Sequence, residues 1–164
     1  SEVVNGTAFN RLFPSPGPGE RLVFTQEKRG FSEAKLKQGD QTTALLAISD
    51  TITAPSARDK FATSEARLQG WPLVEQGGQA SALLVAQRFQ VKVIGQGIGL
   101  DSQQRHDLLA AFRLRELAAL APAARGGRTA LLPAPLPPVA APASDPSSAR
   151  ESASLEPSVL EPAA

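Results

Sequence analysis

The C-terminal quarter of the chain cannot contribute much to a hydrophobic core. From Ala121 onward the sequence is dominated by alanine, proline and serine with scattered charges, and it contains no aromatic residue. Such a segment buries too little apolar surface to offset the entropy lost on ordering. We therefore predict a disordered, partly polyproline-II tail over residues 121–164, so that any folded body lies in the first three quarters of the chain.

Prolines also constrain the beginning of the chain. Pro14, Pro16 and Pro18 alternate with serine and glycine in the stretch FPSPGPG, which disfavours both helix and strand there. We expect residues 1–19 to form an extended N-terminal segment, and residues 20–120 to form the folded domain.

The first half of that domain has the period of β-strands. Apolar and polar residues alternate around Ala34 and Leu36, and Glu33, Lys35 and Lys37 are expected to face outward. A continuous apolar run at 42–50 predicts a central strand that is buried on both faces. The predicted strands in this half are residues 21–26, 30–37 and 42–50.

The period then changes to that of a helix over residues 53–70. Ser56 is the expected N-cap, and Gly70 is the expected stop. The apolar stripe of this predicted helix consists of Ala54, Ala57, Phe61, Ser64 and Leu68.

The same order of elements follows in the second half. A helix capped by Asp101 or Ser102 is expected to continue to residue 120. The predicted strands before it are residues 71–76, 81–87 and 88–95. The result is an α+β fold of order β-β-β-α-β-β-β-α, with a mostly antiparallel sheet and helices packed on it. This order resembles the architecture of Mog1 and PsbP-like proteins, by analogy only.

The glycine-rich stretch GQGIGL at residues 95–100 is one residue short of a dinucleotide fingerprint, and no strand is expected after the helix that follows it. The Gly-Lys-Ser/Thr of a phosphate loop is also missing. We interpret the stretch as a turn between a strand and a helix, and we expect no cofactor.

Few residues are candidates for catalysis or metal binding. The chain has no cysteine, and His106 is its only histidine, so we expect neither a metal site nor a catalytic residue. Asp50 follows a buried strand, which is a position where active sites occur, but local capping explains it as well.

Three residues form the expected binding surface: Trp71, Asp50 and Phe31. The net charge is +1, and acidic and basic residues are interspersed, which gives no case for nucleic-acid binding. The lysine-rich hairpin around Phe31 is typical of an exposed sheet edge that resists aggregation.

The chain has no apolar run long enough to span a bilayer, and it starts at Ser1 without methionine. A mature exported protein with its signal peptide removed would start in this way, and so would a trimmed chain. We expect a periplasmic or otherwise exported protein, with a cytoplasmic location as the alternative.

The sequence therefore favours a non-enzymatic accessory or binding module of the bacterial cell envelope, with a small ligand or a protein as its partner. One alternative is a hydrolase-type enzyme with a site around Asp50, His106 and an unmarked serine. Another is a scaffold protein that recruits a partner through its proline-rich tail.

Overall fold

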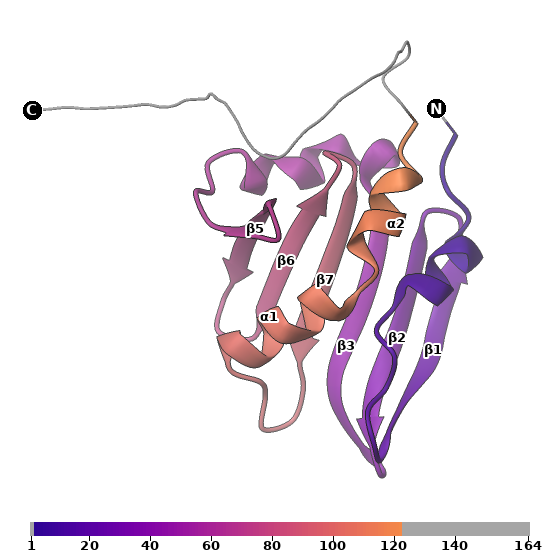
Figure 1. Ribbon diagram of the computed structural model, residues 1–164, viewed down its shortest axis with the longest axis vertical. Coiled ribbons are helices and arrows are strands. Elements are labelled where there is room, and N and C mark those ends of the chain that lie inside the picture. The colour runs from indigo at the N-terminus through magenta and orange to yellow at the C-terminus, as the bar shows by residue number, and fades with distance from the viewer. Residues whose placement is uncertain (1, 123–164) are drawn as a thin grey trace, which may run out of the picture. The chain divides into compact units, whose positions relative to one another are not determined.

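The computed structural model describes residues 2–122 and contains one antiparallel β-sheet with helices (Figure 1). The strand order is β1-β2-β3-β7-β6-β5-β4, and every neighbouring pair is antiparallel. The strands are β1 (Glu20–Lys28), β2 (Phe31–Gln38), β3 (Gln41–Asp50), β4 (Arg67–Leu68), β5 (Trp71–Gln76), β6 (Ala80–Val85) and β7 (Phe89–Gly95). The predicted α+β class with an antiparallel sheet is confirmed.

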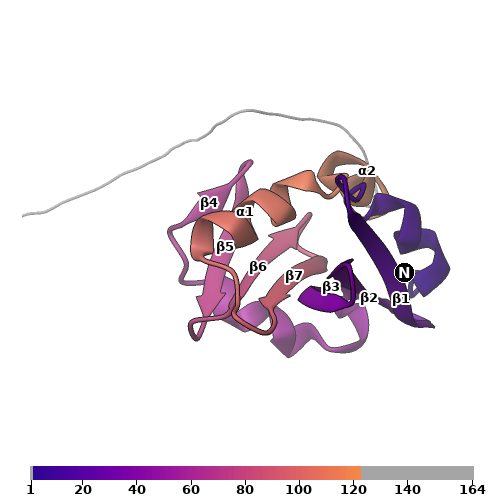
Figure 2. The same cartoon turned by 90° about the horizontal axis from the view of Figure 1, so that it is seen from below.

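The helices divide between the two faces of the sheet. We call one side the helix face, where the 3₁₀-helix η1 (Gly6–Leu12) and the α-helices α1 (Ser102–Ala111) and α2 (Leu114–Ala119) cover the main core. The other side, which we call the outer face, carries the 3₁₀-helices η2 (Thr51–Thr53) and η3 (Pro55–Phe61). Figure 2 shows the α-helices and the η2–η3 segment on opposite sides of the strands.

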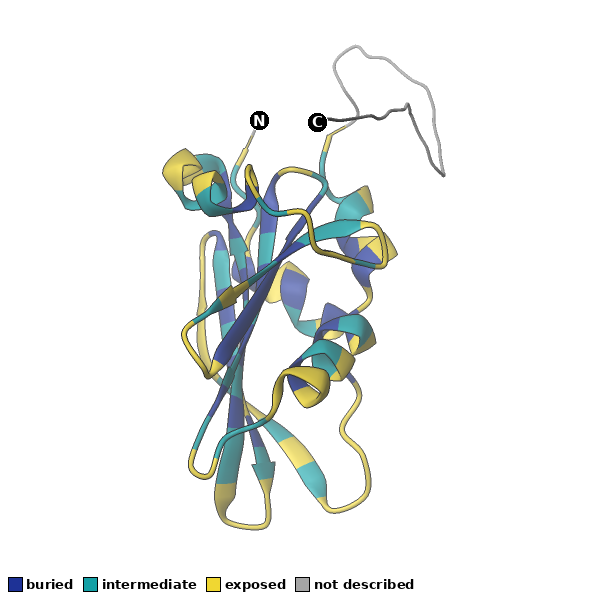
Figure 3. Ribbon diagram, turned by 90° about the vertical axis from the view of Figure 1, so that its left-hand side faces the viewer, coloured by how far each residue is buried: buried dark blue, intermediate teal, exposed yellow. Residues whose placement is uncertain are grey.

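Strand alternation gives the two faces different chemistry. In β7, Phe89, Val91 and Val93 are fully buried on the helix face, whereas Gln90 and Lys92 between them are half-buried on the outer face. The central strands are accordingly the most buried part of the structure, and exposed residues gather at the turns (Figure 3). The outer face of β7 therefore carries polar side chains at these two positions.

The N-terminal segment differs from the expected extended conformation at residues 6–12, which form η1. Asn5 caps this helix by accepting a hydrogen bond from the Thr7 amide. Phe9 and Leu12 are fully buried in the main core, so burial of these side chains orders the segment before the prolines begin.

The helix predicted over residues 53–70 is wrong. The chain forms η2 and η3 instead, and then turns back at Gln69 and Gly70 to pair β4 with β5. No side chain caps η3, whose N-cap is Ala54 rather than Ser56. Phe61 is the only buried member of the predicted stripe, and it packs against β6. Gly70 takes a positive φ in the β4–β5 turn and is not a helix stop.

Two other elements also differ from expectation. β3 is central, as predicted, but its burial alternates, and β6 is the strand that is buried throughout. The single helix expected up to residue 120 is broken at Phe112 and Arg113. Phe112 is extended and packs on Phe13 with ring centroids 5.1 Å apart, while the Arg113 amide donates to the Leu12 carbonyl. Packing against η1 therefore outweighs continuation of the helix.

The glycine-rich stretch is a turn, as predicted, with positive φ at Gly97 and Gly99. Asp101 caps α1 in a capping box with Gln104. The tail predicted for residues 121–164 lies outside the described residues from 123 onward. Among the described helices, none has the length and hydropathy needed to cross a membrane. The exported location stays a prediction.

Candidate binding site

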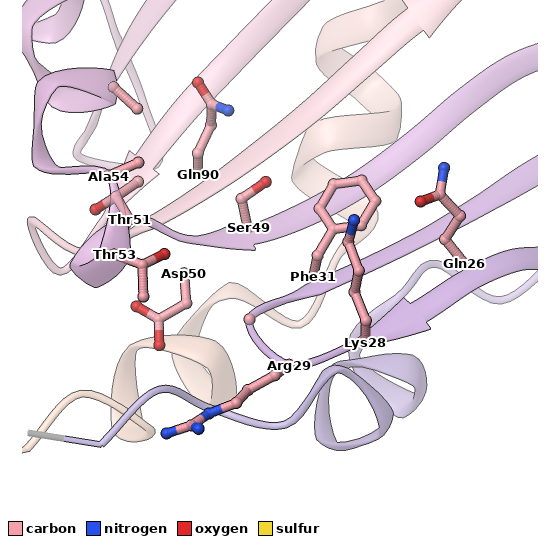
Figure 4. Close-up of a pocket in the computed structure, with 12 residues that line it drawn as sticks. Gln26, Lys28, Arg29, Phe31, Ser49, Asp50, Thr51, Thr53, Ala54 and Gln90 are labelled. Carbon is pink, nitrogen blue, oxygen red and sulfur yellow. The ribbon is translucent and has the colours of Figure 1, made fainter.

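A hollow of about 430 Å³ lies on the outer face of the sheet (Figure 4). Its floor contains Phe31 of β2, Ser49 of β3 and Gln90 of β7. The register places these residues in one row, since Phe31 is opposite Ser49 and Ser49 is opposite Gln90. Residues in register on neighbouring strands point to the same face, so the three side chains line one side of the sheet.

The walls come from two segments at the ends of the strands. Lys28 stands at the end of β1 with its Nζ 5.6 Å from the centre of the Phe31 ring, while Arg29 extends away from the floor in Figure 4. Thr53, Ala54 and Ala57 of the η2–η3 segment form the opposite wall. The two alanines have no long side chain to fill the space between wall and floor.

Several polar groups around this hollow take no part in the hydrogen bonds of the described residues. The Gln90 Oε1 atom is buried and accepts no hydrogen bond. Within residues 2–122, the hydroxyls of Ser49 and Thr53 and the ammonium of Lys28 also have no hydrogen-bond partner. Buried polar atoms in folded proteins are nearly always satisfied, so the Gln90 oxygen beside the hollow is open to a donor that the described residues do not supply.

Asp50 lies behind the hollow, and its carboxylate is fully engaged. Arg88 donates from Nε to Oδ1 at 2.9 Å and from Nη2 to Oδ2 at 2.8 Å. The amides of Val4 and Ile52 donate to the same carboxylate. The Asp50 side chain is 0% exposed, and that of Arg88 is 10% exposed. This pair ties the N-terminal segment and the start of η2 to the ends of β3 and β7.

The pKa of Asp50 reflects these contacts. Burial alone would raise it, but the hydrogen bonds from Arg88 and from the Val4 and Ile52 amides outweigh burial and hold the pKa below its ordinary value. In turn, Asp50 raises the pKa of Arg88 against the effect of burial. Both groups therefore stay charged and paired, and Asp50 positions the wall of the hollow.

Trp71, the third member of the expected binding surface, lies elsewhere. It begins β5, is half-buried and packs against the main core on the helix face. Three strands separate β5 from β2, which carries Phe31. The structure thus brings Phe31 and Asp50 together at the hollow and leaves Trp71 apart from them.

A second polar cluster surrounds His106 on α1. The His106 Nε2 lies 2.6 Å from Oε2 of Glu75, whose Oε1 accepts hydrogen bonds from Ser81 and Arg105. Burial raises the pKa of Glu75, but the hydrogen bonds from Ser81, His106 and Arg105 lower it by more, so the pKa falls below its ordinary value. Arg105 also bonds Ser81 directly. The cluster fastens α1 to β5 and β6.

The groups of the hydrolase alternative do not converge in the described part of the chain. His106 lines a different hollow from Asp50, of about 530 Å³ at the β5 edge of the sheet. Ser81 is fully buried and bonds Glu75 rather than the imidazole. No group of three His, Asp or Glu side chains suitable for a metal ion occurs among residues 2–122.

Ser49 and Gln90 were not singled out from the sequence. The alternation in β7 could have placed Gln90 on the outer face, because Phe89 and Val91 on either side of it were expected on the buried face. Ser49 could not be placed beside it, because the pairing of β3 with β7 joins distant parts of the chain. No family model, curated protein or solved structure matches this chain, so its likeness to Mog1 and PsbP-like proteins stays an analogy of element order.

Proposed function

We propose that this domain is a non-enzymatic binding module whose ligand occupies the hollow on the outer face. The observation that carries the proposal is the floor of Phe31, Ser49 and Gln90, which combines an aromatic ring with polar groups that have no partner among the described residues. Small-molecule sites typically combine a concave surface with a few convergent polar groups.

The size and support of the hollow agree with this role. Its volume of about 430 Å³ falls in the range of sites for small molecules. Its floor belongs to strands that have a neighbour on each side, and the Asp50–Arg88 pair fixes the wall. Such a preformed site orders few side chains on binding, which favours affinity.

The ionisable side chains that could serve catalysis are engaged with one another instead. Asp50 is paired with Arg88, and His106 contacts Glu75. These pairs stabilise the packing of the N-terminal segment and of α1, which supports a scaffold for binding rather than a reacting centre.

A thermal-shift screen of the full chain against small polar metabolites tests the proposal. A ligand that binds only the folded state stabilises it and so raises the melting temperature. At a ligand concentration of a hundred times Kd, the unfolding free energy rises by about 2.7 kcal/mol. We expect at least one compound to stabilise the wild type but not Ser49→Trp, because the indole fills the hollow.

The matched control is Leu45→Trp, which places the same ring at an outward position of the same strand but away from the hollow. We expect this variant to respond as the wild type does. Ligands that stabilise Ser49→Trp as strongly as the wild type would show that the hollow is not the binding site.

A further inference from the structure

The floor of the hollow belongs to a row of side chains that crosses β1, β2, β3 and β7. Lys28 is opposite Phe31 in the register, so its side chain joins the row that Phe31 forms with Ser49 and Gln90. Neighbouring strands lie about 4.8 Å apart, so the row presents an ammonium group, an aromatic ring, a hydroxyl and an amide at regular steps. A ligand that lies along the row therefore meets a positive charge at one end and an amide at the other.

The charges that line the hollow are unbalanced. Lys28 and Arg29 both line it, and neither takes part in an ion pair within residues 2–122. Among the described residues that line the hollow, Asp50 is the only one with a carboxylate, and Arg88 occupies both of its oxygens. The lining therefore has positive charge without a counter-charge, which attracts an anion.

One of these two cations is placed at the floor. The Lys28 Nζ lies 5.6 Å from the centre of the Phe31 ring, whereas Arg29 extends away from the floor (Figure 4). A single ammonium group matches a single negative charge, and a carboxylate accepts its hydrogen bonds. A ligand that contacts both Lys28 and Phe31 therefore carries its carboxylate next to an apolar surface.

The remaining polar groups of the hollow favour a ligand with several hydroxyls. The buried Gln90 Oε1 has no partner, and as an amide oxygen it needs an N–H or O–H donor. The hydroxyls of Ser49 and Thr53, also without partners within residues 2–122, can both donate and accept. These groups come from β3, β7 and η2, so a ligand with one polar group would leave some of them unsatisfied.

We propose that the ligand of this site is a free sugar acid whose carboxylate binds Lys28 and whose ring lies on Phe31. This inference rests on the proposed binding function and names the chemical class of its ligand. The C–H groups on one side of a sugar ring supply the apolar surface for Phe31, and its hydroxyls supply a donor for Gln90 and a partner for Ser49. The volume of about 430 Å³ suits one small molecule.

The test is a titration of the ¹⁵N-labelled full chain with D-galacturonate and, separately, with D-galactose and with acetate. We expect galacturonate to shift the amides of Lys28, Phe31, Ser49 and Gln90. Galactose lacks the carboxylate, and acetate lacks the ring and its hydroxyls. Each of these two compounds should therefore bind at least about tenfold more weakly than galacturonate.

Two variants test the two ends of the row. Lys28→Gln removes the cation, and Gln90→Met removes the unpartnered oxygen while keeping a chain of similar length. Each should weaken binding of galacturonate by about tenfold, since each removes one hydrogen bond to the ligand. Lys28→Gln should change the binding of galactose by less than about twofold, because the neutral sugar has no charge to pair with Lys28.

Lys35→Gln is the matched control, because it removes an exposed cation from the same face at a position that does not line the hollow. At physiological ionic strength, where charges are screened beyond about 8 Å, it should change the affinity by less than about twofold. An equal loss in Lys28→Gln and Lys35→Gln would overturn the carboxylate site.

The binding module and the sugar acid can fail separately. If galacturonate and galactose shift the floor of the hollow with equal affinity, the binding module stands and the carboxylate inference falls. If neither sugar shifts the floor but another compound from the thermal-shift screen does, the module again stands and the sugar-acid inference falls. If no compound shifts the floor, both fall.

Tri-galacturonate distinguishes a free sugar acid from a residue of a polysaccharide. The end of β1 and the η2–η3 segment close the floor on two sides, so we expect tri-galacturonate to bind no more tightly per sugar residue than galacturonate does. Tighter binding per residue that is lost in Lys28→Gln would replace the free acid by an acidic polysaccharide.

Discussion

At the scale of single residues, hydrogen bonding distinguishes the polar groups that hold the fold from those that have no partner among the described residues. Asp50 and Arg88 are buried together and saturate each other, and backbone amides complete the set. Gln90, one residue beyond the Phe89 that pairs with Asp50, has a buried oxygen without a partner. The sequence shows that Asp50 ends a strand, which is why we predicted it at a functional surface. It does not show that Arg88 folds against Asp50 and pairs with its carboxylate.

Removing the charge of Asp50 should strongly destabilise the protein. Asp50→Asn leaves Arg88 buried without its counter-charge, which costs about 3–5 kcal/mol of unfolding free energy. Urea denaturation of the full chain measures this loss, with the exposed turn variant Asp40→Asn as the control that should change little. A loss below about 1 kcal/mol in Asp50→Asn would contradict the structural role of the pair.

The same pair predicts acid sensitivity. Because the folded pKa of Asp50 lies below its unfolded value of 3.8, its contribution to stability is complete above that value. The contribution disappears as the pH falls through the folded pKa. Stability of the wild type should therefore drop more steeply between neutral and strongly acidic pH than stability of Asp50→Asn, and parallel pH profiles would contradict the assignment.

At the scale of elements, local patterns identified the long strands but not the segments that are shaped by distant contacts. Alternation around Ala34 and Val91 predicted the buried face of β2 and β7 correctly. The helical period over residues 53–70 failed because Phe61 packs on β6 and Leu68 pairs with β5. The packing of Phe61 on Ala82 and Leu84 joins distant segments, which no local window contains. The pairing of Leu68 with Trp71 is local, and the helical period concealed the turn at Gln69 and Gly70 between them.

The turn between β6 and β7 predicts a stabilising substitution. Ala86 and Gln87 adopt φ of 55° and 56°, and Arg88 donates back to the Val85 carbonyl, as in a type I′ turn. Gln87 is exposed, so Gln87→Gly relieves the strain of the left-handed backbone without loss of packing. The substitution should raise the unfolding free energy by about 1 kcal/mol.

The reverse change, in the turn between β5 and β6, provides the comparison. Gly77 has a φ of 63°, and a Cβ added there would meet no atom within 4 Å. Gly77→Ala therefore tests the backbone strain alone, and it should lower the unfolding free energy by about 1 kcal/mol. Denaturant midpoints measure both effects. Destabilisation by Gln87→Gly would contradict the positive φ of that turn.

At the scale of the whole molecule, the two faces of one sheet differ in their chemistry. The helix face buries the main core, and the outer face keeps a hollow with unpartnered polar groups and a basic surround. Sequence reasoning predicted the α+β class, but the site depends on β2, β3 and β7 being neighbours. The pairing of β3 with β7 brings residues 44–50 against residues 89–95, and only this long-range contact assembles the floor.

The most direct measurement is an amide chemical-shift map of the full chain with the strongest compound from the thermal-shift screen. The binding role of the outer face predicts that the largest shifts cluster at Phe31, Ser49 and Gln90, with the helix face unchanged. Shifts concentrated on α1 around His106, with the floor of the hollow unaffected, would contradict it.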